Sequence, residues 1–146
     1  MKKIILCLVL ALPVVACRNA QQPSTPALQG TWKLLNGKLI ENGKTTVTDY
    51  TDSLSFIKII NDTHFAFLQH SKDSAAPIAA GGGVYTLHDS TYTEHLQYCS
   101  ARNWEGHDFS FTVSIHGDTL VQKGVEKVPS ANIDRINIET YTRYKQ

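Results

Sequence analysis

The residues best placed to do chemistry lie in segment 84–98, where Glu94 stands among tyrosines and apolar residues. Two runs rich in Tyr, Thr, Val and Leu flank the polar break at residues 88–90, which predicts a β-hairpin. A two-residue turn would set Tyr85 opposite Glu94 on one face. A carboxylate on a mostly apolar face must be hydrogen-bonded, paired or protonated. Glu94 could therefore orient the donor group of a ligand, or a basic side chain or backbone amide could satisfy it.

Aromatic residues alternate with polar ones in the strands expected to flank this hairpin. Segment 109–115 alternates without interruption, which is typical of a strand with one buried face. Aromatic side chains on such faces can line an apolar pocket, or they can simply fill the core. Besides Tyr85 and Glu94, the candidate pocket residues are Phe65, Phe67, Tyr98, Phe109 and Phe111.

The sequence gives no positive support for catalysis, for a metal or for another cofactor. Its six histidines show no His-x-His or His-x₃-His spacing, and it has neither a Gly-x-Ser-x-Gly elbow nor a phosphate-binding loop. Cys99 could act as a nucleophile only with a base nearby, and a strand-end cysteine is more often a small core residue. We therefore expect a protein that is not an enzyme and that holds no metal and no cofactor.

Short strands joined by turns account for most of the chain, with two Asn-Gly dipeptides among the turn signals. No long amphipathic helix and no repeat is evident. The expected fold class is all-β, an antiparallel meander closed into a small β-barrel, because closure removes exposed sheet edges. Three longer connections are expected, the second of which contains Trp104: residues 69–80, 99–108 and 125–132.

The last expected strand, residues 133–145, has two candidate inward faces. Hydrophobic patterning favours Ile136 and Ile138 as the inward residues. The opposite face carries Glu139 and Tyr141. The residues alone leave both alternatives open.

The N-terminus is expected to be a targeting segment. Lys2 and Lys3 precede a short apolar run and then Leu-Pro-Val-Val-Ala-Cys at residues 12–17, which resembles the lipobox of bacterial lipoproteins. The resemblance implies cleavage before Cys17 and a lipid on its thiol, with several acyl chains giving a stable anchor. We expect a signal peptide at residues 1–16, the lipidated cysteine and a flexible tether at 17–27, and the folded domain at 28–146.

Charge and compartment narrow the range of partners. The whole sequence carries a formal charge of +1, and loss of Lys2 and Lys3 with the signal peptide leaves −1. A nucleic-acid partner would need a concentrated basic surface, so none is expected. Arg18 follows the lipidated cysteine, and the lipoprotein resemblance then implies a lipid-anchored protein of the cell envelope, at the outer membrane.

The start of the folded domain carries a second resemblance. Gly30-Thr31-Trp32 resembles the Gly-x-Trp signature of lipocalins, in which an arginine on the last strand packs across the tryptophan. Arg143 stands where that arginine would be. Together with further short motifs in order along residues 63–120, region 28–145 is similar to the lipocalin-like domain of Bacteroidetes lipoproteins. The resemblance implies that Trp32 and Arg143 close one barrel end through a cation–π contact, and it favours an inward Glu139 and Tyr141.

These expectations lead to two hypotheses for function. The first is a lipid-anchored lipocalin-like protein that binds a small, largely apolar ligand inside the barrel. The alternative is an interaction module with a filled core, which would bind an envelope protein or a glycan through loops 69–80 and 99–108. A cavity inside the barrel distinguishes the two, because fold alone does not.

Overall fold

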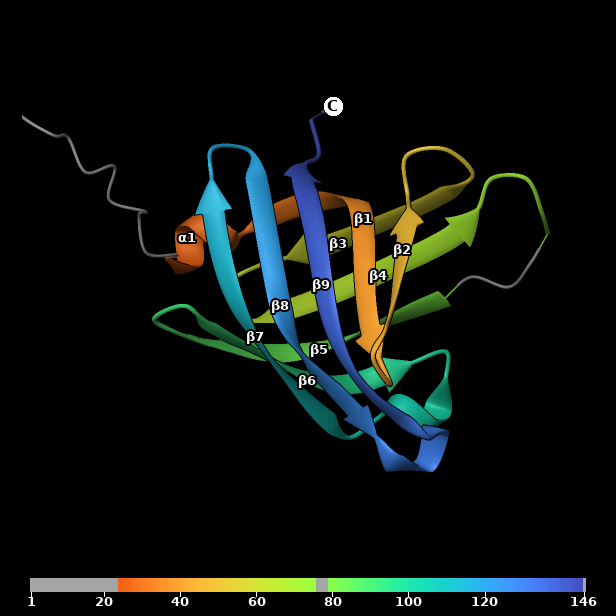
Figure 1. The fold of residues 1–146 in the computed structure, drawn as a ribbon. Helices are drawn as coiled ribbons and strands as arrows, with labels where there is room; N and C mark the ends of the chain where they lie inside the picture. The colour runs from red at the N-terminus through yellow and green to blue at the C-terminus, as the bar shows by residue number, and fades with distance from the viewer. Residues whose placement is uncertain (1–23, 76–78, 146) are drawn as a thin grey trace, which may run out of the picture.

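The computed structural model describes residues 24–75 and 79–145. These residues form one nine-stranded antiparallel sheet (Figure 1). A helical turn, α1 (Thr25–Leu28), precedes the first strand, and the 3₁₀ turns η1 (Arg102–Trp104) and η2 (Pro129–Ala131) precede β7 and β9. The strands are β1 (Gly30–Glu41), β2 (Lys44–Asp49), β3 (Leu54–Ile60), β4 (His64–Ser71), β5 (Ala79–His88), β6 (Thr91–Cys99), β7 (His107–His116), β8 (Thr119–Val128) and β9 (Ile133–Arg143).

Pairing of the first strand with the last closes the sheet into a barrel. Strands β3 to β9 pair in chain order, and β1 pairs with β9 on one edge and, through residues 30–33, with β3 on the other. The remaining strand, β2, lies outside this eight-strand ring and extends the second half of β1. The predicted all-β fold, an antiparallel meander closed into a barrel, is confirmed.

The two ends of the barrel differ in what covers them (Figure 1). Helix α1, the turn between β7 and β8 and the C-terminal end of β9 lie at one end, and η1, η2 and the turn between β1 and β2 lie at the other. Large side chains pack the first end solid, among them Trp32, Tyr92 and Tyr141, which are all fully buried. We call the first end the closed end and the second the open end.

Trp32 and Arg143 seal the closed end as the resemblance implies. The Arg143 guanidinium lies 4.1 Å from the centre of the Trp32 ring. It also donates hydrogen bonds of 2.8 Å to the carbonyl oxygens of Ala27 and Gln29, and the Trp32 indole donates one of 2.8 Å to the carbonyl of Leu28. A desolvated cation–π contact contributes about 2 kcal/mol. The last strand is thus tied to the segment that enters the first.

Several predicted boundaries shift in the structure. Strand β8 continues to Val128 because Glu126 and Val128 keep the inward alternation, so the predicted loop at 125–132 is reduced to η2 and one further residue. Strand β4 runs to Ser71 and β5 begins at Ala79, which shortens the predicted connection at 69–80. Helix α1 begins inside the predicted tether, since Leu28 is fully buried at the closed end. The predicted signal peptide and the lipidation site Cys17 lie outside the described residues.

Candidate ligand-binding site

The open half of the barrel contains a cavity of about 370 Å³. Inward-facing side chains line it because residues alternate between the two faces of every strand. Its walls combine apolar groups with buried polar ones. The apolar wall is formed by Leu39, Phe56, Phe67, Leu96, Trp104, Phe109 and Phe111. A volume of this size accommodates a small ligand.

A buried ion pair lies where the cavity meets the closed half of the barrel. Lys58 on β3 and Glu94 on β6 point inward and are only 3% and 7% exposed. Lys58 Nζ donates to Glu94 Oε1 at 2.7 Å and to Gln122 Oε1 at 3.1 Å. The same ammonium lies 5.9 Å from the centre of the Phe111 ring. Glu94 therefore has a basic partner, one of the alternatives that the sequence left open.

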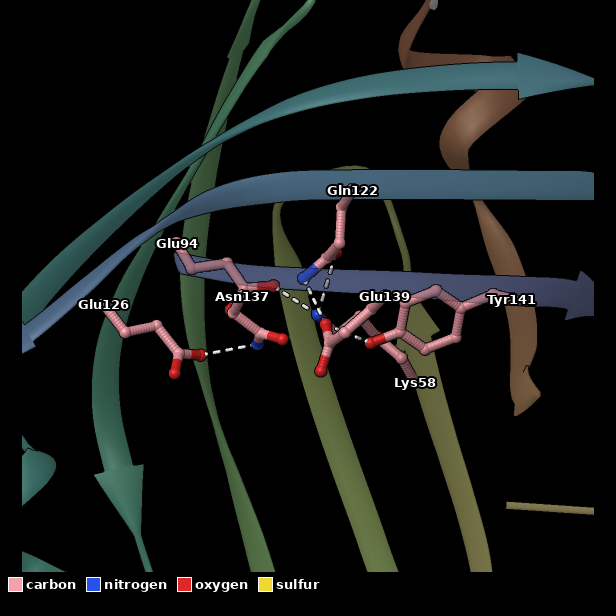
Figure 2. Close-up of polar contacts among 7 residues, drawn as sticks. All are labelled: Lys58, Glu94, Gln122, Glu126, Asn137, Glu139 and Tyr141. Atoms are coloured by element: carbon pink, nitrogen blue, oxygen red, sulfur yellow. Dashed lines mark hydrogen bonds and ion pairs between the residues drawn. The ribbon is translucent and has the colours of Figure 1, made fainter. Parts of the chain in front are cut away.

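Gln122 connects this ion pair to the last strand, β9, through hydrogen bonds (Figure 2). Its Nε2 donates to Glu139 Oε2 at 2.6 Å, and the Tyr141 hydroxyl donates to the same oxygen at 2.8 Å. Lys58, Glu94, Gln122, Glu139 and Tyr141 form one connected network, which we call the polar floor. Such a network holds each member in a fixed position.

A second polar group stands nearer the mouth of the cavity. Glu126 accepts from Arg135 Nε at 2.7 Å through one carboxylate oxygen and from Asn137 Nδ2 at 2.7 Å through the other. The Arg135 guanidinium lies 5.5 Å from the centre of the Trp104 ring. Trp104 also packs on Phe109 with ring centres 5.7 Å apart. The tryptophan in the loop before β7 thus covers the barrel end and lines the cavity at once.

Burial and charge shift several pKa values on the polar floor. Burial alone would lower the pKa of Lys58, but the carboxylates of Glu94, Glu139 and Glu126 outweigh it and raise that pKa. Burial raises the pKa of Glu94 in spite of the opposing effect of Lys58. The pKa of Tyr141 is raised by burial and then by the charge of Glu139. Perturbed titratable groups gathered in a cavity are typical of functional sites.

Tyr92 lies beneath this floor. Its hydroxyl is buried and is close enough to the Glu94 carboxylate to affect its charge. Burial raises the pKa of Tyr92, and the charge of the neighbouring Glu94 adds to this effect. The Tyr92 ring packs on Tyr85, with ring centres 5.2 Å apart. The phenol therefore remains neutral and belongs to the packed half of the barrel.

The structure brings four of the seven predicted pocket residues together: Glu94, Phe67, Phe109 and Phe111 line the cavity. Phe65 and Tyr85 face inward as expected, but they do not line the cavity. Both belong to the packed core, where the Tyr85 hydroxyl donates to the carbonyl of Asn61 at 2.8 Å. The predicted pairing of Tyr85 with Glu94 across the hairpin is confirmed.

Tyr98 does not lie in the interior, and a β-bulge is the reason. The pairing of β5 with β6 shifts between Gly82 and Gly83, so that Gly83 pairs with Leu96 and Gly82 with Tyr98. The extra residue, Gln97, reverses the inward–outward alternation after Leu96. Tyr98 is consequently 71% exposed. Cys99, which would otherwise point outward, lines the cavity as a partly buried free thiol.

The last strand turns its polar face inward. Asn137 and Tyr141 are buried, and Glu139 lines the cavity between them. The placement implied by the family resemblance is therefore correct, and hydrophobic patterning would have predicted the wrong face. Sequence reasoning missed Lys58, Gln122, Glu126, Arg135 and Asn137. Polar residues at every second position from Arg135 to Arg143 were the signal that could have revealed part of this set.

No group of three or more His, Cys, Asp or Glu side chains in the described part of the chain could hold a metal ion. No helix among residues 24–75 and 79–145 is long and apolar enough to cross a membrane.

Comparisons with known proteins add only general likenesses. No family model and no curated protein matches the chain. Among solved structures, a redesigned β-barrel is similar at 14% identity with a TM-score of 0.47, covering 83% of this chain and 95% of that one. A mutant of the fluorescent protein UnaG is similar at 9% identity with a TM-score of 0.43, covering 84% of this chain and all of that one (100%). At sequence identities this low, the ligand of a similar structure does not indicate the ligand of this protein.

Proposed function

We propose that the protein binds a small, largely apolar ligand in the open half of its barrel. The cavity of about 370 Å³ carries this proposal, because it joins an apolar wall to the polar floor in one space. Apolar walls with a few placed polar groups are the usual construction of small-molecule sites. The wall would provide affinity through burial, and the floor would fix the orientation of the ligand.

The composition of the floor supports binding over a purely structural role. A buried ion pair seldom stabilises a fold more than apolar packing of the same volume would. Lys58 and Glu94 nevertheless occupy the interior, beside aromatic rings that could have filled it. The alternative function, an interaction module with a filled core, is less well supported because the interior contains a cavity of about 370 Å³. Binding rather than catalysis is proposed, because the combination of an apolar wall and a few fixed polar groups suits a held ligand.

A neutral environment-sensitive dye tests the proposal directly. N-phenyl-1-naphthylamine should bind the purified protein with saturable fluorescence enhancement. Trp104 lines the cavity, so bound dye should also quench tryptophan emission.

Two adjacent alanines on β5 provide a matched pair of variants. Ala79 lines the cavity, whereas Ala80 lies on the outer face of the barrel. Ala79→Phe should weaken dye binding at least about tenfold by filling the cavity, and Ala80→Phe should leave it unchanged. Equal dye affinity in both variants and the parent, or no saturable binding at all, would rule out the cavity as the site.

We further propose that the protein is a lipid-anchored lipocalin-like lipoprotein of the Bacteroidetes type, acting at the outer membrane. The lipobox-like segment 12–17 and the motifs along residues 28–145 support this proposal. Metabolic labelling with an alkyne fatty acid should tag the parent protein and should not tag Cys17→Ala. Labelling of both proteins alike would show that Cys17 is not the lipidation site.

A further inference from the structure

The charges that line the cavity do not balance. Lys58 is paired with Glu94, and Arg135 is paired with Glu126. The fifth charged group, Glu139, makes no ion pair within the described residues. Its two hydrogen-bond donors, Gln122 and Tyr141, are both neutral. With three carboxylates against two cations, the cavity has a surplus of negative charge at Glu139 when all five groups are ionised.

One oxygen of Glu139 is held fixed and the other is left available. Gln122 Nε2 and the Tyr141 hydroxyl both donate to Oε2, at 2.6 Å and 2.8 Å. Oε1 accepts no hydrogen bond among the described residues, and Figure 2 shows it turned away from both donors. The residue paired with Glu139 on β1 is Gly37, which also lines the cavity. The ring of Tyr50 lies over this glycine, 3.4 Å from the position that an added Cβ would take.

The surroundings of Glu139 suit the apolar part of an amphiphile. The ring of Tyr141 lies 6.2 Å from that of Phe56, which in turn stacks on Phe67 at 5.8 Å. Tyr50 packs edge-on against Phe56 at 6.0 Å. These rings form a continuous aromatic wall that starts at the Glu139 partner Tyr141. Aromatic faces also attract cations, as the position of Lys58 Nζ, 5.4 Å from the centre of the Tyr141 ring, illustrates.

We propose that the ligand is an amphiphilic amine whose protonated amino group pairs with Glu139 and whose apolar part lies on the aromatic wall. This inference rests on the proposed binding function and specifies its ligand class. An anionic head group is disfavoured because the cavity has a surplus of negative charge and each of its two cations already has a carboxylate partner. The raised pKa of Lys58, in spite of its burial, is consistent with a negative potential in the cavity.

Three probes with one chain and different head groups test the inference. At neutral pH, 1-octylamine is cationic, 1-octanol is neutral and octanoate is anionic. Each is titrated against the complex of the parent protein with N-phenyl-1-naphthylamine, and the concentration that displaces half of the dye is compared. Because hydrogen bonds to a charged partner are the strong ones, 1-octylamine should displace the dye at a concentration about tenfold lower than 1-octanol. Octanoate should be the weakest of the three.

A charge-neutral variant assigns the preference to Glu139. Glu139→Gln keeps the shape and an acceptor oxygen, so it should remove the advantage of 1-octylamine and leave 1-octanol unchanged. Asp134→Asn, an exposed carboxylate on the same strand, is the matched control and should keep the full preference. Preference for the amine in Glu139→Gln equal to that in the parent would overturn the assignment.

The series on the parent protein separates failure of the inference from failure of the proposed function. Binding of the dye together with equal displacement by amine and alcohol, or with octanoate as the best competitor, would overturn the amine assignment and leave the binding function intact. Absence of saturable binding by the dye would overturn both, because all three octyl probes are measured through displacement of the dye. This comparison does not depend on whether Glu139→Gln folds.

Discussion

Replacement of Lys58 by methionine is the most direct probe of the polar floor. Lys58→Met keeps a long apolar side chain but removes the cation and both hydrogen bonds that Lys58 donates. Glu94 is then left 7% exposed, without a counterion, in a space that already contains Glu139. Gln122 also loses the donor to its carbonyl oxygen. The variant should therefore be less stable than the parent.

The size of the effect follows from the options open to Glu94. Removing one partner of a buried ion pair costs about 3–5 kcal/mol. Glu94 can take up a proton instead of remaining charged, and the free energy of this protonation limits the loss of stability. For a carboxyl group with an unfolded pKa of about 4.3, protonation at pH 7 costs roughly 4 kcal/mol, or about 1.4 kcal/mol per pH unit. We expect Lys58→Met to lower the free energy of unfolding by about 3–4 kcal/mol at pH 7.

The cost should also depend on pH, with a definite sign. Burial raises the pKa of Glu94 above its unfolded value, so the folded state binds this proton more tightly than the unfolded state. Proton binding by Glu94 therefore stabilises the folded state fully below the unfolded pKa. This stabilisation is lost as the pH rises through the folded pKa. Removal of Lys58 raises the folded pKa further. The difference in stability between variant and parent should therefore shrink to about 1 kcal/mol near pH 5.

Urea denaturation followed by the fluorescence of the buried Trp32 measures both quantities. The double variant Lys58→Met/Glu94→Gln should lose this pH dependence, because the titrating group is gone. Lys123→Met, on the exposed face of β8, should change the free energy of unfolding by no more than about 0.5 kcal/mol. A cost below about 1 kcal/mol at pH 7, or the same cost at pH 5, would refute the reasoning, since Glu94 would then be solvated rather than dependent on Lys58.

Three further substitutions test the frame around the site by urea denaturation. Gly30→Ala should destabilise by about 1–3 kcal/mol, because Gly30 has a φ of +130° and an added Cβ would lie 2.6 Å from Arg143 Nη1. Gly83→Ala should cost about 3 kcal/mol, because its Cβ would collide with the carbonyl oxygen of His95 and force β5 and β6 apart. Tyr98→Ala should stay within about 0.5 kcal/mol and leave dye binding unchanged, since Tyr98 is exposed outside the barrel. A loss of dye binding in Tyr98→Ala would contradict the conclusion that Tyr98 does not line the cavity.

The hairpins and the closed barrel could be predicted because their signals are local. Turn dipeptides, alternation and the Gly30-Thr31-Trp32 motif each act over a few residues. The exit of Tyr98 from the interior could not be predicted in this way. It depends on one unpaired residue, Gln97, whose accommodation is decided by the facing strand. A bulge of this kind leaves no distinct mark in the sequence that carries it.

Lys58 and Gln122, two members of the polar floor, escaped prediction for a different reason. Lys58 stands in a run where apolar residues occupy both faces, so periodicity does not show which face is inward. Its partner is 36 residues away along the chain, and Gln122 is 64 residues away. An inward-facing lysine can be predicted only when Glu94 and Gln122 are known to face it across the barrel. Hydrophobic patterning assumes an apolar interior, and that assumption fails around the cavity, where polar side chains face inward.

The hydrogen bonds that Arg143 donates to Ala27 and Gln29 also place both ends of the described domain at one end of the barrel. They hold the segment that enters β1 and the end of β9 at one pole of the molecule (Figure 1). The mouth of the cavity is at the opposite pole. A tether that joins the described domain ahead of residue 24, or a fusion that joins it after residue 145, would therefore be attached at the closed end. Either attachment point is at the pole opposite the mouth of the cavity.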